Sequence, residues 1–132
     1  MPDYSQVSWI AVVAAAVVHI ILGYVWYMPM VFGKRWEAAS GQSLSTGAPP
    51  PMTIAYMVIA ALLAALGMGL WFAGGSVVNG AISGVLVWLY FVAPVTAAGV
   101  FFEKKSWMWW GITAGYWLVG LAIMGVIVNI IR

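Results

Sequence analysis

Charged side chains are absent from three long stretches of this sequence. Residues 4–33, 38–102 and 106–131 contain no Lys, Arg, Asp or Glu. A transmembrane helix needs about 20 apolar residues to cross roughly 30 Å of hydrocarbon, so the first and last stretches each supply one crossing. The middle stretch would be about 100 Å long as a single helix at ~1.5 Å per residue. It must therefore fold back on itself.

The composition indicates that lipid, not water, surrounds most of the chain. Of its 132 residues, 65% are hydrophobic and 6% are charged, whereas a soluble domain carries about 25% charged residues. The net charge of +2 is too small to indicate nucleic-acid binding, and there is no cysteine for a disulfide or a thiolate metal site. The sequence thus predicts an all-α integral membrane protein in contact with membrane lipids.

Local breakers divide the middle stretch. Residues 40–51 form a polar loop rich in Gly and Pro, and residues 74–80 contain two closely spaced turn signals, Gly74-Gly75-Ser76 and Asn79-Gly80. We predict one integral membrane domain, residues 1–132, folded as a four-transmembrane-helix bundle. Its helices are expected at about 7–28, 53–73, 80–102 and 107–130. Residues 31–40 are too short and too charged to span, and are expected to lie along the interface.

The basic residues predict an orientation. With four crossings, the loops after the first and third helices share one side of the membrane, and these loops carry Lys34, Arg35, Lys104 and Lys105. The only basic residue on the opposite side is Arg132. Because Lys and Arg accumulate in cytoplasmic loops, we expect these two loops in the cytoplasm and both termini outside.

Aromatic residues support the same spans. Tryptophan and tyrosine favour the membrane–water interface, where an apolar ring and a polar edge are both satisfied. Trp26, Tyr27 and Trp36 flank the first basic loop, and a second group flanks the other. That second group is Trp107, Trp109 and Trp110.

A family resemblance covers nearly the whole chain. Residues 23–29 (GYVWYMP) followed by 32–36 (FGKRW) resemble the signature of the DUF1761 family of small bacterial membrane proteins. Residues 88–94 (WLYFVAP), 102–104 (FEK) and 115–116 (GY) fit the same pattern. The resemblance implies a four-helix membrane protein with no assigned function. We expect a multi-pass protein of a bacterial inner (cytoplasmic) membrane. It transfers no catalytic or binding residue, and His19 is not part of the pattern.

His19 is the main candidate for chemistry. It lies about 18 Å along the first predicted helix, near the bilayer midplane. An ionisable residue at that depth is a functional hypothesis by default, and an imidazole can relay protons or ligate a haem or metal. It is nevertheless the only histidine, and no Asp or Glu lies inside a predicted span. A structural histidine hydrogen-bonded to a neighbouring helix is therefore the favoured interpretation, and no metal or cofactor is predicted.

The remaining sequence features concern helix shape and helix packing. Pro94 lies inside the third predicted helix and removes a backbone donor, which predicts a kink, read either as static packing or as a hinge. Gly80-x-x-x-Gly84 and Gly111-x-x-x-Gly115 have the spacing that lets membrane helices approach closely. Whether these glycines meet within one chain or between chains is not readable from the sequence.

Three functions remain open at this point. The leading hypothesis is a non-enzymatic homo-oligomer, or an accessory subunit of a membrane complex, that acts through helix–helix contacts. The alternative is an oligomeric transporter or channel for a small solute or ion, with His19 and the Pro94 kink lining the path. The third is a haem- or pigment-binding module that uses His19. No nucleophile–base pair or metal-ligand spacing indicates an enzyme, although a lone carboxylate at a loop leaves that class open.

Overall fold

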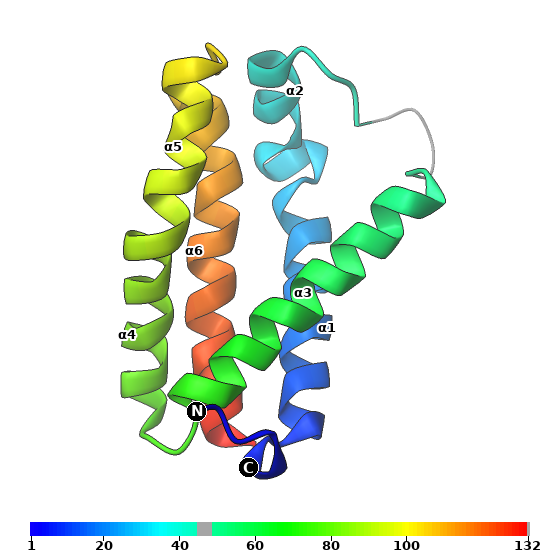
Figure 1. Cartoon of the computed structure of the whole chain (residues 1–132). Helices are drawn as coiled ribbons and strands as arrows, with labels where there is room; N and C mark the ends of the chain where they lie inside the picture. Colours follow the sequence, from blue (N-terminus) through cyan, green and yellow to red (C-terminus); the bar gives the residue numbers. More distant parts are fainter. Residues whose placement is uncertain (45–48, 132) are drawn as a thin grey trace.

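The computed structural model describes residues 1–44 and 49–131, and every regular element within them is helical (Figure 1). Four stretches of this described part are long and apolar enough to cross a membrane. They are α1 (Trp9–Trp26), α3 (Pro51–Phe72), one continuous rod made of α4 (Val77–Val87), the π-helical segment η3 (Trp88–Val92) and α5 (Ala93–Phe102), and α6 (Trp107–Ile130). The predicted all-α fold with four membrane-spanning helices is confirmed.

Two sequence predictions lie partly beyond this description. Residues 45–48 and 132 are outside the described residues. The predicted polar loop at 40–51 is therefore seen only at its two ends, and the placement of Arg132 stays a prediction.

Serine side chains set the start of three helices. Ser8, Ser76 and Ser106 each accept a hydrogen bond from the backbone N–H three residues later, at the N-termini of α1, α4 and α6. Because Ser76 is the cap, α4 begins at Val77, three residues before the predicted start. Asn79, expected in the turn, lies instead in the first turn of α4 and donates its backbone N–H to the Ser76 hydroxyl.

The chain leaves α1 earlier than predicted, at Trp26. Met28 is extended, which is the conformation favoured before a proline, and a π-helical turn η2 (Pro29–Gly33) follows. A short helix α2 (Lys34–Ser40) then runs to Gly41, which ends it with a left-handed backbone (φ 75°). A side chain at Gly33 would collide with the backbone carbonyl of Tyr27, so only glycine permits the tight path from η2 into α2.

Helix α6 occupies the centre of the bundle and contacts α1, α3, α4, α5 and α2. Its closest neighbour is α4, which lies alongside it in Figure 1. A Cβ added at Gly80 would collide with the carbonyl oxygen of Gly125, and one at Gly84 with the carbonyl oxygen of Leu121. A Cβ at Gly125 would in turn collide with the carbonyl of Gly80. Glycine thus allows backbone-to-backbone contact, which strengthens dispersion packing where lipid supplies no hydrophobic drive.

Asn129, near the C-terminal end of α6, ties that end of the bundle together. Its amide nitrogen donates to the carbonyls of Phe72 (2.9 Å) and Gly125 (2.8 Å), and its amide oxygen accepts from the N–H of Gly75 (2.8 Å). The side chain is 5% exposed. It therefore supplies hydrogen-bond partners to the end of α3 and to the α3–α4 turn.

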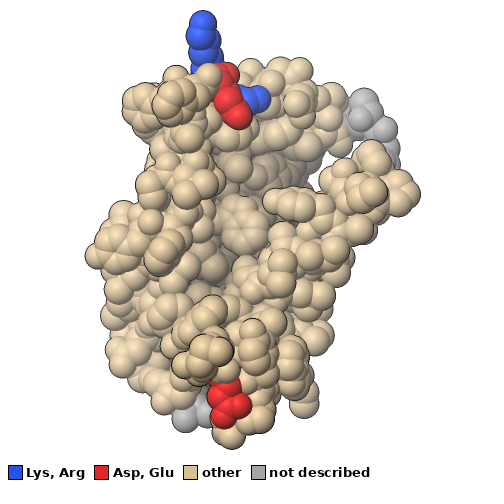
Figure 2. All heavy atoms as spheres, viewed as in Figure 1, with Lys and Arg blue, Asp and Glu red and all other residues tan. Residues whose placement is uncertain are grey.

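Helix α3 crosses the bundle obliquely (Figure 1). It packs against α1 and α6 and meets α4 near the α3–α4 turn, and each of its first nine residues, 51–59, is exposed. The other end of the molecule carries α2 and the α5–α6 connection, and thus the two basic loops. The N-terminus and the C-terminal end of α6 lie at the end opposite these loops. Figure 2 shows charged atoms only at the two ends, separated by a wide uncharged band.

Candidate ligand cavity

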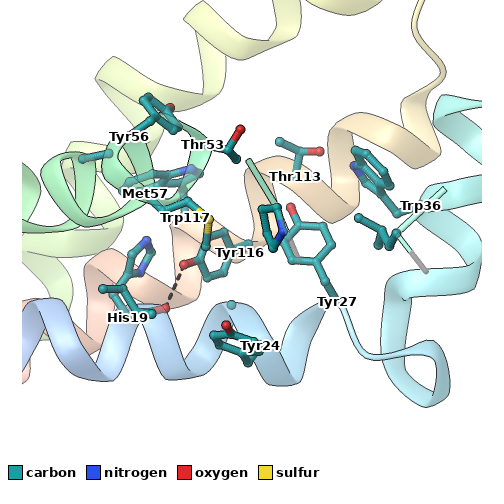
Figure 3. Close-up of a pocket in the computed structure, with 15 residues that line it drawn as sticks. His19, Tyr24, Tyr27, Trp36, Thr53, Tyr56, Met57, Thr113, Tyr116 and Trp117 are labelled. Carbon is teal, nitrogen blue, oxygen red and sulfur yellow. Dashed lines mark hydrogen bonds between the residues drawn. The ribbon is translucent and has the colours of Figure 1, made fainter. Parts of the chain in front are cut away.

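The oblique path of α3 leaves a cavity of about 650 Å³ between α1, α2, α3 and α6. It runs along the basic half of the molecule, from His19 at one end toward Tyr27 and Trp36 at the other (Figure 3). Two lining tyrosines, Tyr24 on α1 and Tyr56 on α3, are 70% and 66% exposed. The cavity therefore opens between α1 and α3, toward the surrounding lipid.

His19 forms the deep end of the cavity. Its side chain is 3% exposed, and neither ring nitrogen has a hydrogen-bond partner. The imidazole stacks on the ring of Tyr116, with 4.4 Å between ring centroids and an 18° angle between planes. It also lies 4.5 Å from the ring of Trp117. The predicted hydrogen bond from this imidazole to a neighbouring helix is thus wrong: α6 offers it aromatic faces.

Two glycines, one on α1 and one on α6, each leave room for a ring of the opposite helix. A Cβ at Gly120 of α6 would collide with Nδ1 of His19, and a Cβ at Gly23 of α1 would lie 2.8 Å from the Tyr116 hydroxyl. Each helix therefore receives a ring of the other against a glycine. The Tyr116 hydroxyl also donates to the backbone carbonyl of His19 (2.7 Å). This arrangement holds His19 in place through its backbone and ring face, and leaves its nitrogens free.

The middle and outer parts of the cavity are aromatic with scattered hydroxyls. The ring of Tyr27 meets those of Trp36 and Tyr116 edge to face. Thr113 of α6 and Thr53 of α3 add hydroxyls to the lining. The Thr113 hydroxyl is buried and makes no hydrogen bond of standard geometry, with Tyr27 as its near neighbour. No charged residue lines the described wall, so the cavity suits an uncharged molecule.

Three tryptophans make hydrogen bonds between α6 and the helices beside it. The Trp26 indole N–H donates to the carbonyl of Ile112 (2.9 Å), and that of Trp88 to the carbonyl of Ala114 (2.7 Å). The Trp110 indole donates to the hydroxyl of Thr96 (3.0 Å). These bonds connect α1 and the α4–α5 rod to the wall of α6. Sequence spacing carries no signal for them, because their acceptors are mostly backbone atoms of another helix.

The remaining packing candidates behave differently from one another. Gly115 faces the ring of Trp26, whereas no atom of a neighbouring element lies within 4 Å of a Cβ built at Gly111. The second glycine pair is therefore not one packing unit within this chain, because only its C-terminal member points at a neighbour.

Pro94 is the second residue of α5 and follows the π-helical η3. The Thr96 hydroxyl donates to the carbonyls of Val92 (2.7 Å) and Ala93 (3.3 Å).

The predicted topology residues gather at one end of the molecule. Lys34 and Arg35 lie on α2, and Lys104 and Lys105 follow α5. The Lys105 ammonium lies 5.5 Å from the centre of the Trp109 ring, within range for a cation–π contact. Trp107 packs edge to face on Trp110 and on Phe101 at the same end.

A second cavity of about 470 Å³ lies between α3 and the α4–η3–α5 rod. Phe91 and Val92 of the rod line it, together with Leu63 of α3, and Trp117 separates it from His19. Figure 2 shows this face of the molecule hollowed beside α3. Its described lining is almost wholly apolar and holds no hydroxyl, imidazole or amide, so we take the first cavity as the candidate site.

Together, the fold and the cavity define a small multi-pass membrane protein with an aromatic intramembrane cavity. Residues 10–129 match the family described as a protein of unknown function (DUF1761). The chain belongs to this family, as its motifs at 23–36 predicted. No curated protein and no solved structure matches the chain.

Proposed function

We propose that this protein is a non-enzymatic binding protein that takes an uncharged, lipophilic small molecule from the bilayer. The observation that supports this is the cavity of about 650 Å³, lined by aromatic rings and a few hydroxyls and open between α1 and α3. Ligand sites generally measure about 300–1,000 Å³ and combine an apolar wall with a small number of polar groups. A molecule already dissolved in lipid can enter such a site sideways, without passing through water.

Binding fits the lining better than catalysis or transport. His19 has no carboxylate beside it in the described wall, so it lacks the partner that normally orients a catalytic imidazole. The stacked rings of His19, Tyr116 and Trp117 lie at the deep end, where a transport path would have to continue toward the opposite face. The cavity is therefore better suited to holding a molecule than to passing one across.

We further propose the inner (cytoplasmic) membrane as the location, with the basic loops in the cytoplasm and both termini outside. The support is the gathering of Lys34, Arg35, Lys104 and Lys105 at one end of the molecule. In this orientation the cavity lies in the cytoplasmic leaflet, because Trp36 and Tyr27 mark that interface.

The direct test is to identify what co-purifies with the protein. We expect mass spectrometry of an organic extract from the purified protein to show one neutral lipophilic compound at about one per chain. The cavity-filling variant Ala60→Phe should lose it, because Ala60 lines the cavity. The matched control is Ala55→Phe, which enlarges an exposed residue of the same helix outside the lining. Equal loss from both variants, or no such compound from the wild type, would contradict the proposal.

A second function has its own support, namely a homo-oligomer or accessory subunit. Each of residues 51–59 of α3 is exposed, and Ile54, Val58 and Ile59 lie outside the cavity lining. A partner helix could bury this segment in place of lipid. The mass of the protein in mild detergent, corrected for bound detergent, would separate a monomer from an assembly.

The pigment-binding function also retains one observation in its favour. Met57 lines the same cavity as His19, and histidine with methionine is a known pair of axial haem ligands. Both imidazole nitrogens are covered, however, so ligation would require the side chain to move. Absorbance in the Soret region of the purified protein tests this directly, and a colourless preparation would contradict it.

A further inference from the structure

The cavity contains polar groups that a site for a plain hydrocarbon chain would not need. Nδ1 and Nε2 of His19 and the hydroxyl of Thr113 are buried without a standard hydrogen bond. Native proteins leave few buried polar groups unpaired, and in hydrocarbon each costs several kcal/mol of solvation. These two side chains lie on adjacent helices and line the same cavity. Nδ1 of His19 packs against Gly120 of α6, so a ligand that offers hydrogen-bonding atoms would satisfy Nε2 and the Thr113 hydroxyl.

The shape and chemistry of the wall favour a flat ring. Three rings close the deep end, namely His19, Tyr116 and Trp117, and two more stand at the outer end, Tyr27 and Trp36. Aromatic faces and edges recognise other flat rings more specifically than they recognise a flexible acyl chain. A charged ring is disfavoured, because no described lining residue could neutralise it at this depth.

Met57 is a flexible part of the cavity wall. This methionine lines the cavity and is 37% exposed. Its unbranched thioether can change rotamer at little cost. The hydroxyls of Thr53 and Tyr56, both exposed, provide polar contacts nearer the opening.

Resting on the proposed binding function, we infer that the ligand is a neutral, flat ring compound that bears carbonyl or hydroxyl groups. Its ring lies among the aromatic side chains between His19 and Tyr27. Its polar substituents exchange hydrogen bonds with Thr113 and, after a shift of the imidazole that uncovers it, with Nε2 of His19, whereas Nδ1 packs against Gly120 of α6. Any apolar tail leaves between α1 and α3 into the lipid.

Three neutral probes separate this inference from its alternatives. They are 2-methyl-1,4-naphthoquinone, which is a flat ring with two carbonyls, 2-methylnaphthalene, which has the same ring without them, and 1-oleoylglycerol, which has a single acyl chain. Binding is measured by calorimetry on full-length protein in phosphatidylcholine nanodiscs, with empty nanodiscs subtracted for partitioning. We expect the naphthoquinone to bind saturably and about tenfold more tightly than 2-methylnaphthalene, as one or two hydrogen bonds would provide.

Two variants test the polar contacts. Thr113→Val keeps the shape of the side chain and removes the hydroxyl, and His19→Leu removes both ring nitrogens. Each should reduce the preference for the naphthoquinone over 2-methylnaphthalene, because a contact with the polar substituents is lost that 2-methylnaphthalene never makes. If His19→Leu does not fold, Thr113→Val alone decides the test. Thr96→Val is the control, because Thr96 lies on α5 outside the cavity.

The outcomes distinguish the inference from the function on which it rests. Equal affinity for the two ring probes, or an unchanged preference in Thr113→Val, would overturn the hydrogen-bonded ring and leave a binding protein. Saturable binding of 1-oleoylglycerol alone would overturn the ring and indicate an acyl-chain site. No saturable probe together with no co-purifying compound would overturn both.

Discussion

Whether a glycine of this bundle can be replaced depends on how closely the backbone of a neighbouring helix approaches it. Glycine is common in the sequence, yet only some glycines lie where another helix leaves no room for a Cβ atom. Gly84 meets the backbone of Leu121, whereas Gly111 meets no neighbouring element. Helical spacing alone treats the two residues alike, so their difference makes a matched test.

Gly84→Ala should destabilise the protein by about 1–3 kcal/mol, because the new methyl group would force α4 away from α6. Gly111→Ala should be neutral or should stabilise by up to about 1 kcal/mol, because alanine is the better helix former and has open space there. Reversible unfolding in mixed detergent micelles measures both. A similar loss in the two variants would contradict the assigned α4–α6 contact.

The contact between His19 and Gly120 predicts a coupled pair of substitutions. Gly120→Ala should cost about 1–3 kcal/mol, since its methyl group would overlap the imidazole. In a His19→Ala background the same substitution should cost little, because the ring is gone. A double-mutant cycle of unfolding free energies measures this coupling. Additive effects would mean that the imidazole does not rest on Gly120.

At the scale of elements, a few hydrogen bonds connect the four helices, whose contact surfaces are otherwise apolar. Indole N–H groups of Trp26 and Trp88 reach carbonyls of α6, and Asn129 reaches α3 and the turn that follows it. Interhelical hydrogen bonds in membranes contribute about 0.6–2 kcal/mol each. The Asn129 contacts fix the C-terminal end of α3, which also packs against α1 and α6.

Asn129→Ala should loosen the junction of α3 and α4. It removes the partners of the Phe72 carbonyl and the Gly75 N–H, and we expect a loss of about 1–3 kcal/mol. Hydrogen exchange of residues 72–76 should rise more than that of α1. Asn79→Ala is the control, since Asn79 is exposed and close by. Equal exchange in the two variants would contradict the proposed role of Asn129.

At the scale of the whole molecule, the topology can be tested because the chain has no cysteine. Single cysteines at Ser5→Cys and Lys104→Cys lie at opposite ends of the bundle. In intact cells, a membrane-impermeant maleimide should label Ser5→Cys, and should reach Lys104→Cys only after the membrane is opened. Ala16→Cys, in the buried core, should stay unlabelled. The reverse pattern would contradict the proposed orientation, and labelling of both ends from one side would contradict the four-helix topology.

Much of the molecule could be predicted from one-dimensional patterns. The charge-free stretches indicated four helices, and the DUF1761 motif around Trp26 indicated the family. The α4 start was misplaced by three residues because a serine cap at Ser76 competes with a nearby Asn-Gly turn signal. The π-helical turns before Lys34 and Ala93 were not predicted, since they depend on how the chain re-enters the bundle.

The amino-acid sequence by itself determined that lipid surrounds the chain, how many times the chain crosses the membrane and where the basic loops cluster. These features follow from local hydrophobicity and charge. The candidate cavity was decided only by the tertiary structure. It depends on the angle of α3, and on His19 and Tyr116 each finding a glycine on the opposite helix. Such contacts join residues about 100 positions apart through close packing, and no spacing within one helix records them.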